Sequence, residues 1–140
     1  MKVFRRVILT FFWAMLFVAA GCEHADPLDP NRIEPRLSSI QLNIFNLNCA
    51  LSGCHAGPNA QLGLDLSAGR ARATTVNVQS VENTALFRIA PGDPDNSYLV
   101  WKIEGRPEIS GARMPRGRAP LPQAQIDAIR QWIADGAQDN

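Results

Sequence analysis

Two cysteines and a histidine form the most distinctive chemical pattern in the sequence. Cys49 and Cys54 are separated by four residues, and His55 follows the second cysteine directly. Two thiols can add to the vinyl groups of a porphyrin, and the adjacent histidine can then coordinate the iron. The usual gap between such thiols is two residues, but Ser52 and Gly53 suit a longer gap that bulges away from the ring. The string is therefore a candidate site for covalent haem attachment.

The same residues are compatible with two other structures. A disulfide between Cys49 and Cys54 is possible in an oxidising compartment, but it would close only a short loop and contribute at most about 2 kcal/mol. A structural zinc ion needs four ligands, and there is no second Cys/His pair to complete such a site. The string favours haem over the disulfide and over the metal.

Met114 is a candidate for a second iron ligand. It is the only methionine beyond residue 21, and Gly111, Pro115, Pro120 and several arginines surround it in the chain. This segment is too irregular to bury a methionine merely for packing. A thioether suits low-spin haem iron, and a His/Met pair raises the reduction potential. The alternative is a surface methionine in a polar loop.

A helix over residues 38–48 would deliver Cys49 to the ring. Ser38 is a suitable N-cap for it. The apolar residues recur at helical spacing and predict one buried face, formed by Ile40, Ile44 and Leu47 with Phe45 beside it.

The remaining segments predict an all-α, loop-rich domain over residues 38–140, with the N- and C-terminal helices packed around the cofactor. We expect a loop at 62–66, a short helix at 67–74 and irregular or short extended segments at 76–90. Residues 93–97 favour the start of a helix that Gly105 and Pro107 end. A last helix is expected over 122–135, capped by Gly136. The apolar side chains expected to line the core are Val76, Val78, Val81, Leu86, Phe87, Ile89, Ile126, Ile129, Trp132 and Ile133.

The first 21 residues are typical of a secretory signal. Three basic residues precede 15 uncharged ones, a stretch short of the roughly 20 that span a membrane. The stretch ends in Val-Ala-Ala-Gly before Cys22, which resembles the lipobox of bacterial lipoproteins, so Cys22 is predicted to be acylated. The alternative is an uncleaved anchor with an incidental cysteine. Glu23 in the next position favours the outer membrane over the inner one.

Residues 22–37 are predicted to be a linker between the lipid and the domain. Pro27, Pro30 and Pro35 disfavour a helix and favour an extended tether. His24 is expected to be solvated there rather than to bind a metal.

The charge balance excludes some classes of function. The chain has Lys+Arg 14 against Asp+Glu 13, without a basic block, so nucleic acid is not an expected partner. Apart from His55 the only histidine is in the linker, so a hydrolytic Ser/His/acid arrangement is not expected either.

Residues 38–137 resemble a class I cytochrome c domain of a bacterial envelope lipoprotein. The resemblance rests on Phe45 four residues before Cys49, the cysteine–histidine string, residues 63–67 (GLDLS), residues 91–99 (PGDPDNSYL), Met114-Pro115 and the helix containing Ile126 and Trp132. A four-residue gap between the thiols is a variant among bacterial cytochromes c. Gln41 departs from the family, which usually has a glycine where the first and last helices cross.

The resemblance implies one haem c, bound through Cys49 and Cys54, with His55 proximal and Met114 distal. The implied function is electron transfer rather than catalysis, with redox proteins of the periplasm or membrane as partners and no small-molecule substrate. Phe45 and Trp132 would meet at the helix crossing, and Arg88 and Arg113 are candidates to pair with the haem propionates. Tyr98 and Trp101 are expected to serve the core rather than the ring edge.

Two other functions are also compatible with the sequence. One is a haem sensor or peroxidase in which Met114 leaves the sixth position of the iron free. The other is a haem-free structural or interaction lipoprotein, stapled by a Cys49–Cys54 disulfide.

Overall fold

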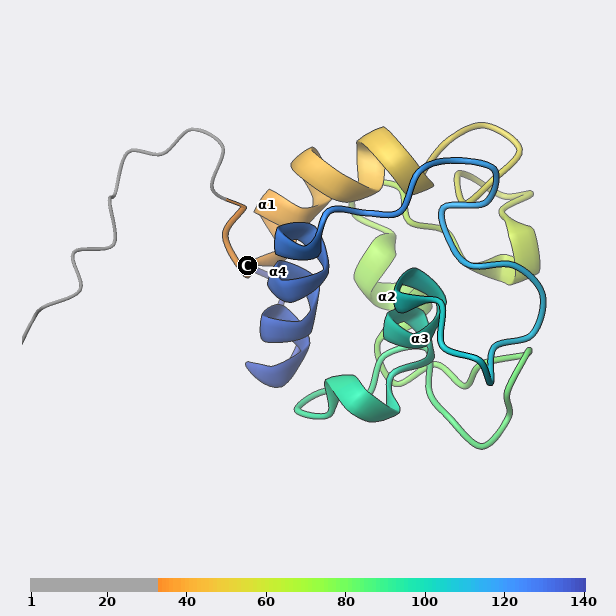
Figure 1. Cartoon of the computed structure of the whole chain (residues 1–140). Helices are drawn as coiled ribbons and strands as arrows, with labels where there is room; N and C mark the ends of the chain where they lie inside the picture. The colour runs from red at the N-terminus through yellow and green to blue at the C-terminus, as the bar shows by residue number, and fades with distance from the viewer. Residues whose placement is uncertain (1–32) are drawn as a thin grey trace, which may run out of the picture. The chain divides into compact units, whose positions relative to one another are not determined.

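A computed structural model describes residues 33–140, and Figure 1 shows their arrangement. The signal segment, Cys22, His24 and most of the expected linker lie outside the described residues. The helical elements, in chain order, are α1 (Leu37–Ile40), η1 (Gln41–Cys49), η2 (Gln61–Gly63), α2 (Ala71–Thr75), η3 (Pro94–Asn96), α3 (Tyr98–Glu104) and α4 (Gln123–Ala134). Within residues 33–140 there are only isolated β-bridges and no strands, so the fold is mostly helical and rich in loops, as expected.

The expected first helix is present, but its second half has a wider turn than an α-helix. α1 continues directly into η1, a π-helix, and the amide of Ala50 donates to the carbonyl of Phe45, five residues earlier. Ile44 and Phe45 are buried as expected, whereas Leu47 is 61% exposed. The prediction for Leu47 was wrong because a π-helix takes more residues per turn, which rotates this position away from the core.

The last helix agrees closely with the sequence pattern. α4 buries Ile129, Trp132 and Ile133 almost completely. Gly136 has a φ of +96°, a conformation that favours glycine. Its amide donates to the carbonyl of Ile133, and the amide of Ala137 donates to that of Trp132, which ends the helix in a Schellman motif.

The two ends of the described chain meet. α1 contacts α4, and the chain's last residues lie beside α1 in Figure 1. The amides of Leu37 and Ser38 each donate to Asn140 at 2.8 Å, one to its side chain and one to its backbone oxygen. Asn140 therefore satisfies the start of α1, and the Ser38 side chain does not cap it as the sequence predicted.

Phe45 and Trp132, the aromatic pair expected at the helix crossing, are both about 1% exposed and belong to one hydrophobic core. Gln41, which stands where the family usually has glycine, donates its amide to the carbonyl of Leu66 at 2.8 Å. This bond ties the first helix to the loop that follows the cysteine–histidine string.

The middle of the chain differs from the sequence prediction in detail. α2 starts later than expected, after a turn at Gly69 with a φ of +74°. Ile89 is fully buried, but Val81 is 58% and Phe87 45% exposed, so these two do not line the core. The interior positions beside them belong instead to the polar residues Ser80 and Arg88, which are buried.

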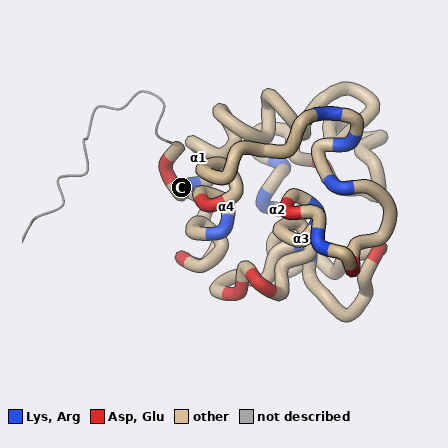
Figure 2. Tube along the Cα trace, in the orientation of Figure 1, with Lys and Arg blue, Asp and Glu red and all other residues tan. Residues whose placement is uncertain are grey.

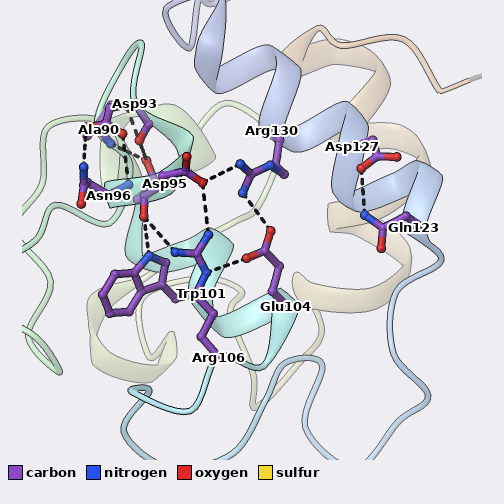
Figure 3. Close-up of polar contacts among 11 residues, drawn as sticks. Ala90, Asp93, Asp95, Asn96, Trp101, Glu104, Arg106, Gln123, Asp127 and Arg130 are labelled. Carbon is purple, nitrogen blue, oxygen red and sulfur yellow. Dashed lines mark hydrogen bonds and ion pairs between the residues drawn. The ribbon is translucent and has the colours of Figure 1, made fainter.

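α3 and the preceding turn follow the sequence pattern. The Asp93 carboxylate accepts from the amide of Asn96, and Gly105 ends α3 with a φ of +73°. Four charged side chains then form a closed ring that links η3, α3 and α4 (Figure 3). The ion pairs are Asp95–Arg130 at 2.6 Å, Arg130–Glu104 at 2.8 Å, Glu104–Arg106 at 2.7 Å and Arg106–Asp95 at 3.3 Å.

Candidate functional site

A cavity of about 620 Å³ brings together the residues that the sequence singled out. It is bounded by the end of η1 and the loop after it, by α3, and by the loop that connects α3 to α4. Cys49, Cys54, His55 and Met114 all line it. Three of these residues come from one short string, and Met114 comes from a distant loop that the fold places across the same cavity.

The wall of the cavity is largely apolar. The apolar side chains come from η1, the loop after it, η2, the segment before α3, α3, the loop before α4 and α4, and they include Phe45, Leu51, Leu62, Leu64, Leu66, Val81, Leu99, Ile103, Leu121 and Ile129. Such a wall suits a largely apolar ligand that carries a few polar groups.

Backbone contacts hold His55 in place. Its Nδ1 lies 3.2 Å from the carbonyl oxygen of Leu64, and its own carbonyl accepts from the amide of Leu66 at 2.8 Å. Burial lowers the pKa of His55, outweighing the backbone contacts to Leu64 and Gln61, which raise it. A neutral ring with its proton on Nδ1 donates to Leu64 and keeps the lone pair of Nε2 for a metal.

The side chain of Asp65 shapes the loop that carries the Leu64 carbonyl. One carboxylate oxygen accepts from the amides of Gly57 and Ser67, at 3.1 and 3.0 Å. A hydrogen bond from the Ser67 side chain, and then the amides of Ser67 and Gly57, lower the pKa of Asp65. Asp65 thus connects the two ends of the loop that follows His55. From the sequence, Asp65 is recognisable only as part of residues 63–67 and not as the residue that holds this loop.

The two thiols differ in their surroundings. Both cysteines are free, Cys54 is exposed, and Cys49 is half-buried against the hydrophobic core. Burial, and then the neighbouring Cys54, raise the pKa of the Cys49 thiol to about 12. Between them the chain turns at Gly53, where φ is +78°, and Ser52 is exposed. The expected outward bulge is therefore limited to Ser52, because Leu51 and Gly53 line the cavity and Ala50 packs against the core.

Met114 is half-buried and packs against the hydrophobic core. Its amide donates to the carbonyl of Lys102 at 2.8 Å, which ties the loop to α3. The chain around Met114 has no regular secondary structure, as expected. Met114 therefore faces the cavity from a loop with a fixed anchor on the neighbouring helix.

Two buried cations belong to the cavity wall. Arg88 is 9% exposed and donates to the backbone carbonyls of Leu62, Gly63 and Thr74. Burial lowers its pKa. Among residues 33–140 no carboxylate pairs with Arg88, and it is not the solvated arginine that was the alternative to a propionate partner.

Lys102 is the second cation, and it was not predicted from the sequence. Its Nζ lies 3.1 Å from the Glu82 carboxylate and donates to the Ser110 carbonyl at 2.7 Å. A single charge inside the apolar stretch 98–103 was the available signal, because a lysine in such a stretch is buried only with partners. Its partners come from distant segments and could not be read from the stretch itself.

The other candidates divide between the cavity and its surroundings. Tyr98 is buried and lines the cavity, and its hydroxyl accepts from the amide of Ser110 at 2.9 Å. Trp101 does not line the cavity, and Arg106 lies over its ring instead. Arg113 is also outside the cavity wall, and its aliphatic chain lies against Gly105.

Two further findings concern residues 33–140. No group of three or more His, Cys, Asp or Glu side chains in this range could hold a metal ion on its own. No helix here is both long and apolar enough to cross a membrane.

No protein-family model, curated protein or solved structure matches the chain.

Proposed function

We propose that the cavity holds one c-type haem and that the protein is a one-electron carrier. The haem would be attached through Cys49 and Cys54, with His55 and Met114 as the axial ligands. The observation that carries this proposal is the convergence of two free thiols, an imidazole and a thioether on one apolar cavity. When bound, a haem supplies a change between ferric and ferrous iron.

The residues present fit this group. The cavity volume of about 620 Å³ lies within the range of about 300–1,000 Å³ typical of cofactor sites. The contact with Leu64 orients the imidazole of His55, and the buried Arg88, which has no carboxylate partner among residues 33–140, would be available to a propionate. Lys102 would bring a second cation, whose charge is shared with Glu82. A sulfur ligand from Met114 and an apolar wall both favour a high reduction potential.

A carrier is favoured over the two alternative functions. Met114 packs against the core at the cavity wall, which supports a filled sixth position rather than an open one for peroxide or a gas. The two free thiols support haem attachment rather than a disulfide. We further propose that Cys22 is acylated, that the lipid-anchored domain faces the periplasm from the outer rather than the inner membrane, and that its partners are redox proteins.

The test is expression of the full chain in cells that mature c-type cytochromes. A pyridine haemochrome assay after acid–acetone extraction measures covalent haem, and the near-infrared sulfur-to-iron band of the oxidised protein reports Met114. Covalent haem should be present in the wild type and absent from the Cys49→Ala/Cys54→Ala double variant. Met114→Leu has nearly the same volume, so it should keep the haem and lose only the band. Cys22→Ser should keep the haem and leave the membrane fraction.

Each alternative predicts a different result. Covalent haem without the band in the wild type would favour a sensor or peroxidase. A wild-type protein without haem, beside other cytochromes that are matured, would favour the disulfide-stapled lipoprotein.

A further inference from the structure

Two side chains of α3 converge on one residue of the loop that leads to Met114. The hydroxyl of Tyr98 accepts from the amide of Ser110 at 2.9 Å, and Nζ of Lys102 donates to the carbonyl of Ser110 at 2.7 Å. Tyr98 and Lys102 are four residues apart, so they lie on one face of the helix. They are 4% and 8% exposed. Both backbone groups of Ser110 are therefore bound by buried side chains of α3.

Ser110 is the last backbone anchor before Met114. Within residues 33–140 no backbone hydrogen bond involves residues 111–113. The next bond along the chain joins the amide of Met114 to the carbonyl of Lys102 at 2.8 Å. Bonds to α3 at Ser110 and at Met114 therefore determine where the loop brings its thioether to the cavity.

A third segment holds Lys102 in turn. Its Nζ lies 3.1 Å from the carboxylate of Glu82. Glu82 belongs to residues 80–86, whose ends are joined by a backbone hydrogen bond of 2.9 Å. Lys102 and Glu104 are the charged residues of α3, which is otherwise tan in Figure 2. Burial of an ammonium in such an apolar helix requires partners. Glu82 supplies the opposite charge, and Ser110 is the group that the buried lysine fixes.

We propose that Tyr98 and Lys102 are positioning residues for Met114 and act by holding Ser110. This inference rests on the proposed function, in which Met114 is an axial ligand. A loop that is already ordered loses less conformational entropy when its sulfur binds, so an external ligand displaces the sulfur less readily. Neither Tyr98 nor Lys102 needs to touch the iron or the sulfur in this role.

The first test is amide hydrogen exchange, measured by NMR on the full chain as purified. The exchange rate of the Met114 amide is divided by that of the Ile129 amide in α4, which reports opening of the core. Tyr98→Phe removes one hydroxyl, and Lys102→Met replaces the ammonium with an apolar group of similar length. Each variant loses one hydrogen bond to Ser110, so each should raise this ratio about tenfold.

Three further variants separate the loss of these bonds from general destabilisation. Thr75→Val is the matched control, because it removes a buried hydroxyl that donates to the carbonyl of Ala71 at 2.7 Å and does not line the cavity. Ser110→Ala keeps both backbone groups. Both variants should leave the exchange ratio unchanged. Lys102→Met/Glu82→Gln leaves no unpaired carboxylate and should give the same ratio as Lys102→Met.

The second test uses the oxidised haem protein. Added imidazole competes with Met114 for the iron, and loss of the near-infrared sulfur-to-iron band measures its affinity. Tyr98→Phe and Lys102→Met should bind imidazole about tenfold more tightly than the wild type, whereas Thr75→Val should bind it equally.

An unchanged exchange ratio in both Tyr98→Phe and Lys102→Met would overturn the proposal. An equal rise in Thr75→Val would do the same, because the loop would then respond to any loss of stability. A wild type without covalent haem would overturn the proposed function alone. The exchange ratio can be measured without haem, and it would still show whether the two side chains hold the loop.

Discussion

Around η3, α3 and α4, charged side chains bind one another, whereas around the cavity they mostly bind backbone carbonyls. Asp95, Glu104, Arg106 and Arg130 close a ring in which each member has two partners (Figure 3). At the cavity, Arg88 donates to three carbonyls and His55 contacts one. In the ring, every charged group is paired with another charged side chain of the protein. At the cavity, the backbone orients Arg88 and His55, whose remaining hydrogen-bonding or ligating atoms are available to a ligand.

The largest expected effect comes from the self-contained region. Trp132→Ala removes a side chain that is 1% exposed in the core, and it should lower the free energy of unfolding by about 3–5 kcal/mol. Urea unfolding followed by circular dichroism measures this. The loss should be similar with and without bound haem. A loss that appears only in the haem-bound form would mean that the helical core also depends on the ligand.

A cavity residue should behave differently. Leu64 is half-buried and lines the cavity, so Leu64→Ala should cost about 2 kcal/mol or less in the haem-free Cys49→Ala/Cys54→Ala background. The cost should rise in the haem-bound protein, where the side chain has a ligand to contact. Leu42→Ala, at a position 66% exposed, is the control and should cost little in either form. An equal loss of unfolding free energy for Leu64→Ala in the haem-free and haem-bound forms would mean that the cavity wall does not contact a ligand.

Gly105 joins the two regions, because it ends α3 and touches the loop of Met114. A Cβ at this position would lie 2.5 Å from the Arg113 side chain, and its φ is +73°. Gly105→Ala should cost about 1–2 kcal/mol from the left-handed backbone alone. Gly136→Ala has a comparable backbone penalty at the end of α4. Only Gly105→Ala should weaken the sulfur-to-iron band, through displacement of Arg113 and Met114. The same weakening in both variants would point to general destabilisation.

The ion-pair ring should contribute less than the core. Glu104→Gln keeps the shape of the side chain and removes its charge, and it should cost about 0.5–1 kcal/mol, because the ring is partly exposed. A double-mutant cycle with Arg130→Gln isolates the pair. A coupling free energy of zero would mean that the Glu104–Arg130 pair adds no stability beyond the packing of α3 on α4.

The ring should also make stability depend on acid pH. Hydrogen bonds from Arg130 and then Arg106 hold the pKa of Asp95 below its ordinary value. This contribution is complete above the unfolded pKa of about 4 and disappears as the pH falls through the lower folded value. Urea midpoints between pH 6 and 2.5 should therefore fall less steeply in Asp95→Asn than in the wild type, with Asp127→Asn as the control. Hydrogen bonds from Ser67 also lower the pKa of Asp65. In Asp95→Asn, Asp65 should therefore still make the urea midpoint fall with falling pH, though less steeply than in the wild type.

The features that depend on local sequence could be predicted. α4 and its glycine cap follow from apolar spacing and the conformational freedom of Gly136, and the bounds of α3 follow from residues 93–97 and Gly105. The cavity residues were found because few side chains can attach and coordinate haem, not because their geometry was foreseen. Their placement around one cavity is a property of the structure that local spacing does not contain.

The features that depend on distant segments could not be predicted. Leu47 was assigned to the core because an α-helical period was assumed, and the change to a π-helix is not visible in the residues of η1. The same is true of Lys102, whose partners lie at Glu82 and Ser110. Arg113 was placed near the haem by its position beside Met114, but the chain turns it toward Gly105.

The bond between Ser38 and Asn140 has a consequence for the order in which the molecule can be built. A chain made from its N-terminus exposes the cysteine–histidine string long before α4 exists, and contacts of such long sequence separation form late. During this interval α1 and η1 lack the helix against which they pack. Both thiols would then be open to the attachment enzyme that the proposed function requires, including the thiol of Cys49, which the finished fold half-buries. Covalent attachment, if the proposed function holds, would precede completion of the fold.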